Sequence, residues 1–445
     1  MRRLALLVPL VVATAGWCGA PEKATGLAPV SAADLPHPEP LRPADFRDVI
    51  LAALGRHLDL TLAALDQGIA SQRLQQAGHD FLPSFDAGAG FSHLHGRKQG
   101  SFGNLRQVDF DRYDPQFGLS LALNLGERIH RLRARQHQYA SSRYRYLDAR
   151  RRVLLGVSEL YQNLRVAQVG TAIAHRLVED RRHMVEVIRA RVTAGTALAS
   201  ELAQARAALA AARSQWVAAA NQWAQASIRL ARVLRWDPQQ LLLAREVPVA
   251  PVPMREDGVR PDREALDEAV KAAGEAASAS WWRLWGPKLQ VQLRYTQLGT
   301  DPGDLDDQEF YRVFLGWRLS LAAWDEIRLQ QRKLARTRVQ LQQLDDAVRA
   351  EVAAVSRQLQ AARARVPLAR ERLAAAREHL ELATARYRAG KTILLEVLNA
   401  EAALAQARFD LVEAVSLLHL ARIRQLADSG ALSPQQLLGE DGEEK

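Results

Sequence analysis

The 445-residue sequence contains a single cysteine, Cys18. One cysteine cannot form a disulfide within the chain, nor can it supply the thiolates of a structural zinc site. The sequence also lacks a nucleophile paired with a base, a glycine-rich phosphate loop and a complete set of metal ligands. We therefore expect a protein that is not an enzyme and that carries neither a cofactor nor a bound metal.

Lysine is scarce as well. It supplies only 7 of the 60 basic residues, so the formal net charge of +10 comes almost entirely from arginine. A basic balance can indicate a nucleic-acid partner. Here the arginines alternate with Glu and Ala along helical stretches instead of clustering, so nucleic acid is not expected. With 48% hydrophobic and 25% charged residues, the composition is that of a folded chain with a large buried surface.

Long apolar runs are missing except at the N-terminus, where one extends from Leu4 to Val12 after two arginines. Small residues follow it, a pattern typical of a bacterial secretory signal, and we predict a signal peptide at 1–20. Cys18 could in principle be lipidated after cleavage, but the bulky Trp17 before it disfavours this. Beyond the signal no run of 18 apolar residues occurs, which excludes a membrane helix. The mature protein is therefore expected either to be soluble in the periplasm or outside the cell, or to cross a membrane as a β-barrel, the one other way to span it.

The sequence is internally duplicated. Residues 191–213 and 386–408 align at an offset of 195, with a glycine and a glutamate at matching places in both. Such self-similarity indicates two copies of one structural unit. The predicted organisation is an N-terminal linker at 21–43, a first repeat at 44–246, a Pro-rich linker at 247–258, a second repeat at 259–430 and an acidic tail at 431–445.

Both repeats show the same predicted order of a helix, two strands and two long helices. The long helices are predicted from apolar residues spaced three and four apart and from an abundance of Ala, Leu, Arg, Gln and Glu. A helix of about 64 residues is about 95 Å long, which indicates a coiled coil. The expected elements are helices at 44–80, 127–192 and 196–235 with strands at 83–93 and 115–125, and then helices at 260–284, 326–388 and 393–428 with strands at 287–297 and 310–321.

The four predicted strands alternate between apolar and polar residues over about ten positions. Tyr311, Val313 and Leu315 fall on one face, for example. An apolar face toward lipid and a polar face toward a lumen are typical of a membrane barrel strand, and the alternative is the edge of a soluble sandwich. The polar face predicts a basic barrel lumen that contains Lys288, Arg294, Arg312 and Arg318.

Tryptophans flank the strands of the second repeat. They could form an aromatic girdle at the membrane interface, or they could pack at the junction between strands and helices. Both interpretations stay open for Trp281, Trp282, Trp285, Trp317 and Trp324.

Four strands are too few to close a membrane barrel, which needs at least about eight. Two chains would give eight strands, whose interior is filled by side chains. Three chains would give 12 strands and room for a pore. A pore therefore requires association of several chains.

The segments 191–195 and 386–398, together with the duplicated layout, resemble the TolC-like outer membrane efflux proteins, or outer membrane factors, over residues 44 to about 430. The resemblance implies a mainly α fold with a small β part. It implies a homotrimer in outer-membrane lipid, with a 12-stranded barrel and a long α-helical coiled-coil barrel reaching into the periplasm. The implied partners are a periplasmic adaptor, or membrane fusion, protein and a proton-driven or ATP-driven inner-membrane pump.

The same resemblance implies functional residues at the two helix reversals. The adaptor would dock at Arg191, Ala194, Gly195, Arg386, Ala389, Gly390, Lys391 and Thr392. The narrow pore entrance would contain Glu201, Glu396 and Asn399, although Glu396 could equally lie on a solvated helix face.

The implied function is a passive exit duct, with small-molecule or metal efflux favoured over protein secretion. Two other hypotheses stay open: a periplasmic adaptor and a coiled-coil scaffold without a pore. An adaptor should carry one helical hairpin within a lipoyl-like domain, and a scaffold would not need matching strands in both repeats.

Overall fold

The computed structural model describes residues 41–99, 103–245, 260–317 and 320–430, and also 432–434 and 437. The predicted signal peptide with Cys18, the Pro-rich linker, Arg318 and nearly all of the acidic tail lie outside these residues. The elements along the chain are β1 (Leu41–Ala44), α1 (Phe46–Arg56), α2 (Leu58–His79), β2 (Ser84–Gln99), β3 (Leu105–Leu123), α3 (Leu125–Thr193), α4 (Ala199–Leu234), β4 (Leu241–Ala244), α5 (Pro261–Trp285), β5 (Lys288–Asp301), β6 (Asp304–Gly316), α6 (Leu321–Arg388) and α7 (Leu394–Asp428).

The prediction of a mainly α fold with a small β part is confirmed. The order α2–β2–β3–α3–α4 recurs as α5–β5–β6–α6–α7, as the internal duplication requires. The strands are longer than the ten residues of clear alternation, since β3 has 19 residues and β2 has 16. None of the helices in the described part of the chain is long and apolar enough to cross a membrane.

The described residues divide into two compact units that do not coincide with the two sequence repeats. One unit consists of Gln168–Ala220 and Leu368–Ala414, which are the ends of α3 and α6 with the starts of α4 and α7. The other holds the remaining described parts of the chain, including every strand. Each unit therefore draws on both repeats, because helices from the two copies pack on one another.

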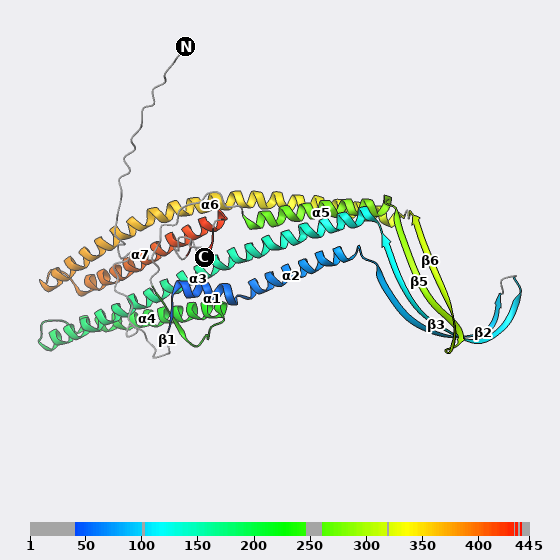
Figure 1. Cartoon of the computed structure of the whole chain (residues 1–445). Helices are drawn as coiled ribbons and strands as arrows, with labels where there is room; N and C mark the ends of the chain where they lie inside the picture. Colours follow the sequence, from blue (N-terminus) through cyan, green and yellow to red (C-terminus); the bar gives the residue numbers. More distant parts are fainter. Residues whose placement is uncertain are drawn as a thin grey trace, which may run out of the picture. The chain divides into compact units, whose positions relative to one another are not determined.

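A four-stranded antiparallel sheet in the order β2–β3–β5–β6 joins the two repeats (Figure 1). Its register sets apolar residues opposite one another in rows that cross the sheet. One row is Phe85, Leu119, Leu293 and Tyr311, and another is Leu121, Val291 and Val313. The predicted apolar face therefore runs continuously across all four strands.

A short parallel sheet of β1 and β4 was not predicted, and residues 41–43 belong to β1 rather than to a linker. Two buried aromatic side chains hold it. The Tyr161 hydroxyl lies 2.8 Å from the Arg245 carbonyl oxygen and 3.1 Å from that of Ala44. The Trp223 indole donates to the Leu242 carbonyl at 3.1 Å. Burial raises the pKa of Tyr161 to about 12, so the phenol keeps its proton at neutral pH.

The predicted helix at 44–80 is two helices. α1 ends at Arg56, His57 takes an extended conformation, and α2 starts at Leu58. The His57 ring accepts a hydrogen bond from the Asp59 amide at 3.2 Å and so caps α2. Sequence periodicity alone does not reveal this break, because both segments are rich in Leu and Ala.

A histidine, His419, is buried in α7 with 8% of its side chain exposed. Burial lowers its pKa to about 4, and the nearby Arg165 and Arg422 act in the same direction. The folded state therefore binds this proton more weakly than the unfolded chain does. The stabilisation is complete above the unfolded pKa of about 6.5 and is lost as the pH falls toward 4.

We expect His419 to make the protein less stable in mild acid. Linkage gives a loss of about 2 kcal/mol at pH 5 relative to pH 7.5. Thermal unfolding of detergent-solubilised His419→Leu should lack this acid-dependent decrease in Tm. The exposed His379→Gln variant should keep the wild-type pH profile. Equal pH profiles for wild type and His419→Leu would contradict the assignment.

Candidate functional site

The chain reverses twice between long helices, from α3 to α4 and from α6 to α7. Both reversals use the same hydrogen bonds. Thr196 N–H donates to the Arg191 carbonyl at 2.8 Å, and Lys391 N–H donates to the Arg386 carbonyl at 2.9 Å. This is the Schellman arrangement, which needs a left-handed residue just past the helix. Gly195 and Gly390 both have φ +72°.

A hydrophobic core packs the two reversals together within their unit. α3, α4, α6 and α7 all contribute buried side chains to it. Its members are Val178, Val185, Ile188, Ala205, Leu209, Ala212, Ala383, Tyr387, Leu394, Val397, Leu398 and Ala400. Small Ala residues on α4 and α6 allow the helices to approach closely. The reversals of the two repeats therefore form one four-helix end, which we call the tip.

Tyr387 links three helices of the tip. Its hydroxyl donates to Glu201 Oε2 at 3.3 Å, and the Arg191 guanidinium carbon lies 5.2 Å from its ring centroid. Only 8% of Tyr387 is exposed. Burial, followed by the Glu201 charge, raises the pKa of the Tyr387 phenol, which therefore remains a hydrogen-bond donor.

The three predicted pore-entrance residues differ in their surroundings. Glu201 is held by Tyr387, as described. Glu396 accepts a hydrogen bond from the Thr392 hydroxyl at the start of α7. Asn399 is exposed on α7. The predicted docking residues Ala194, Arg386, Ala389 and Lys391 are also exposed.

Sequence analysis missed a buried ion pair at the tip. Arg181 Nε lies 3.2 Å from Glu401 Oε2, and the two side chains are only 6% and 11% exposed. The Arg181 guanidinium also donates to the Leu398 carbonyl. Burial raises the pKa of Glu401 despite the neighbouring arginine, and burial lowers the pKa of Arg181. The pair thus joins α3 to α7 at the cost of desolvating two charges.

The polar face of the four-stranded sheet carries the predicted basic residues. Lys288, Arg294 and Arg312 fall on the same face as Ser120, because Ser120 pairs with Gln292 and Gln292 with Arg312. None of the three cations forms an ion pair with a described carboxylate.

The tryptophans lie where the second-repeat strands meet helices. Trp282 packs on Gly126, and its carbonyl accepts from Asn124 Nδ2 at 2.8 Å. This is a packing role at the junction. The most exposed of the five is Trp317 at 63%, and Trp281, Trp285 and Trp324 are 47–49% exposed.

Two further aromatic residues, which sequence analysis did not single out, lie toward the hairpin end of β2 and β3. The rings of Phe91 and Tyr113 are 5.1 Å apart on the apolar face. Pairing of β2 with β3 could have revealed them, since Phe91 and Tyr113 are direct partners.

His93 and His95 follow this aromatic pair on β2. His93 Nδ1 lies 2.9 Å from Asp111 Oδ1, and His95 Nδ1 lies 3.2 Å from Asp109 Oδ2. Both imidazoles thus face carboxylates across the hairpin. Within the described ranges no group of three or more His, Cys, Asp or Glu side chains is arranged to hold a metal ion.

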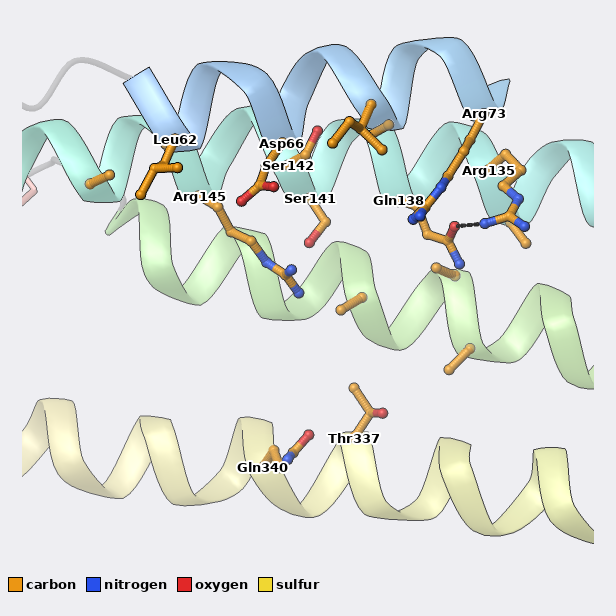
Figure 2. A pocket seen from close by; sticks show the side chains of 18 of the residues that line it. Leu62, Asp66, Arg73, Arg135, Gln138, Ser141, Ser142, Arg145, Thr337 and Gln340 are labelled. Carbon is orange, nitrogen blue, oxygen red and sulfur yellow. Dashed lines mark hydrogen bonds between the residues drawn. The ribbon is translucent and has the colours of Figure 1, made fainter. Parts of the chain in front are cut away.

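A large cavity of about 1720 Å³ lies among α2, α3, α5 and α6 (Figure 2). Arg73 reaches into it from α2, Arg135 and Arg145 from α3, and Gln340 from α6. Small residues of α5, such as Ala272 and Ala276, line another side. Four helices therefore surround one concave surface that combines polar and apolar side chains.

Solved structures share this fold. The Campylobacter jejuni CmeC outer membrane channel matches with a TM-score of 0.79 and 18% identity over 86% of this chain and 85% of that chain. The outer-membrane channel OprN matches with a TM-score of 0.78 and 17% identity, over 86% and 89%. The open state of the Neisseria gonorrhoeae MtrE channel matches with a TM-score of 0.72 and 18% identity, over 86% and 89%. The fold is therefore one also found in outer-membrane channels.

The family model for outer membrane efflux proteins matches residues 49–234 and 262–426. The chain belongs to the outer membrane efflux protein family. It is thus an efflux channel of the bacterial outer membrane that extends into the periplasm. No curated protein sequence gives a significant match.

Proposed function

We propose that three copies of this chain form the exit duct of a tripartite efflux system, which conducts substrates passively out of the cell. An inner-membrane pump supplies the energy, and a periplasmic adaptor joins pump and duct. Small molecules or metal ions are the favoured substrates over secreted proteins. The family membership and the incomplete sheet together support this proposal.

The observation that carries the proposal is the exposed apolar face of a sheet with two open edges. On this face Phe85, Tyr311 and Val313 are 67%, 71% and 74% exposed in the single chain. Among the described strands, β2 and β6 each pair on one side only. An open apolar edge is unstable in water and in lipid alike, since backbone groups must be paired in a bilayer.

Closure by three copies would pair both open edges of the sheet and would turn its apolar face toward lipid. Neighbouring strands along the sheet are antiparallel, so β6 of one copy and β2 of the next would continue the pattern without a break. Twelve strands also leave an aqueous lumen, whereas eight fill with side chains.

The height of the apolar face fits a bilayer. On β3, ten residues separate Tyr113 from Leu123, the two ends of the apolar rows. At about 3.3 Å per residue and a tilt of about 40°, this spans about 25 Å, the height of the apolar band of outer-membrane barrels. The rings of Phe91 and Tyr113 at the hairpin end of the apolar face, and Trp317 at its other end, then fall at the two membrane–water interfaces, where aromatic girdles occur.

Reconstitution into planar bilayers tests the proposal. The mature protein purified in detergent should insert and give discrete conductance steps. A protein that stays monomeric and water-soluble without detergent, and gives no conductance, would exclude the duct.

We further propose that the tip docks the adaptor through both helix reversals. Besides Lys391, the reversals expose two apolar side chains at equivalent positions, Leu198 at 68% and Ile393 at 66%. Exposed apolar residues beside arginine and lysine are suited to a protein partner.

We expect Gly390→Leu to impair export while the trimer persists. A side chain at φ +72° costs about 1–2 kcal/mol and distorts the turn locally, but nothing else lies within 4 Å of the added Cβ. Export in cells and the oligomer mass in detergent are the two measurements. Gly68→Leu, an exposed helical glycine with ordinary φ, is the control. Normal export by Gly390→Leu would count against a docking role.

A further inference from the structure

The cavity among α2, α3, α5 and α6 has a strongly unequal charge. Eight arginine and lysine side chains line it, against four carboxylates. Three of those carboxylates have partners: Asp59 faces His57, Glu159 binds Arg424, and Glu326 accepts from Gln330. Within the described chain only Glu159 binds a cation, so the excess of cations rests on their number, eight against four carboxylates.

Five of the eight lining cations have no acidic partner among the described residues. Arg131 and Arg283 bind Glu127 and Arg152 binds Asp148, whereas Arg135 donates only to the uncharged Gln138. The remaining four are exposed and form no ion pair with any carboxylate of the described chain. They are Arg73, Arg145, Lys333 and Arg336, and they come from α2, α3 and α6. Figure 2 shows Arg73 and Arg145 extending into the space between the helices.

The polar face of the sheet has the same bias. Lys288, Arg294 and Arg312 lie on it without an ion pair to any described carboxylate, and Arg112 lies on it 4.0 Å from Asp114. The other carboxylates on this face are few, and Asp86 is one of them, held by the Ser120 hydroxyl at 3.2 Å. Two separate surfaces of the same unit, one helical and one of strands, are therefore both basic.

Apolar side chains lie among the cations of the cavity. Leu62 and Ile69 of α2 and Val153 and Val157 of α3 line it, together with the alanine row of α5. A ligand with an apolar body and an anionic group satisfies both kinds of side chain at once. A bare inorganic anion leaves the apolar lining in contact with water, and an organic cation is repelled.

We infer that this cavity and the polar face of the sheet form one anion-selective interior, and that the substrates are organic anions with an apolar body, such as carboxylates or sulfonates. The inference rests on the proposed duct. In a closed tube of three copies the concave side of each arc of helices faces the axis, so every unpaired cation would occur three times around it. Rings of Arg or Lys are the usual basis of anion selectivity in pores.

Ion selectivity provides the first test. In a KCl gradient across a planar bilayer, we expect a reversal potential that corresponds to a chloride-to-potassium permeability ratio of several-fold. Arg145→Gln/Arg336→Gln should reduce this ratio by at least half. Arg338→Gln is the matched control, because Arg338 is exposed on α6 but does not line the cavity.

Pore block provides the second test with a matched pair of probes. Hexanesulfonate and hexylammonium have the same apolar chain and opposite charges. We expect hexanesulfonate to block the potassium chloride current at a concentration about tenfold lower than hexylammonium does. The Arg145→Gln/Arg336→Gln variant should lose most of this difference, and Arg338→Gln should keep it.

The outcomes separate the inference from the duct itself. A conducting pore that prefers potassium, or that is blocked equally by both probes, would overturn the anionic substrate class and leave the duct intact. A protein without any conductance would overturn the proposed function, and the inference with it.

Discussion

Replacing Tyr387 with Phe should raise the open probability of the reconstituted pore by about tenfold. The change removes the hydroxyl that donates to Glu201 at 3.3 Å, and with it a tie between α6 and α4. A hydrogen bond to a charged group contributes about 1.5–3 kcal/mol, and 1.4 kcal/mol corresponds to a factor of ten. If opening the tip breaks this tie, its loss shifts the population toward the open state.

Single-channel recording of Tyr387→Phe tests this expectation. Glu201→Gln should have a similar effect, because it removes the charge of the acceptor. Tyr144→Phe on α3 is the control, since Tyr144 makes no side-chain hydrogen bond to any described residue. Unchanged gating in both Tyr387→Phe and Glu201→Gln would show that the contact serves packing alone.

Arg181→Met should destabilise the protein by about 3–5 kcal/mol at pH 8. The change leaves Glu401 buried without its partner, and uncompensated buried charges carry costs of this size. Burial already raises the pKa of Glu401. Without Arg181 the carboxyl should take up a proton more readily, so the loss should be smaller at pH 5 than at pH 8.

Thermal unfolding of three variants checks the ion pair. Arg181→Met/Glu401→Leu should recover most of the loss, because neither charge remains. Arg182→Met is the control, since Arg182 is 53% exposed and pairs only with the exposed Glu179, and exposed pairs contribute at most about 1 kcal/mol. A loss in Arg181→Met no larger than that in Arg182→Met would contradict the assigned role.

Much of the fold follows from local patterns in the sequence. Alternation within β5 and β6 and the helical spacing of apolar residues depend only on neighbours along the chain. The two reversals could be predicted because Gly195 and Gly390 fall at equivalent places in two copies, and only glycine takes φ +72° at little cost. The break at His57 has no equivalent within α5, the described helix that precedes the strands of the second repeat, and was missed.

The parts that could not be predicted depend on packing between distant segments. Tyr387 stands where the first repeat has Val192, and Arg181 stands where the second repeat has Ala376. These differences between the two repeats mark residues through which the repeats contact each other. The sequence does not show which residues they contact. β1 and β4 are about 200 residues apart and have only four residues each, too short for a periodic signal.

The compact units also show what a sequence repeat leaves out. Duplication predicts two copies of one unit, whereas the tip core combines α3 and α4 with α6 and α7. The functional surfaces likewise combine both copies: the sheet alternates their hairpins, and the cavity is lined by α2 and α3 of one copy and α5 and α6 of the other. A single repeat would therefore hold only half of each surface.

The number of copies that close the sheet can be measured directly. Native mass spectrometry of the detergent-purified mature protein, stripped of detergent in the gas phase, gives the protein mass of the complex. The account predicts a single species with three times the mass of the mature chain. A stable monomer, or a dimer whose eight strands would leave no open lumen, would contradict it.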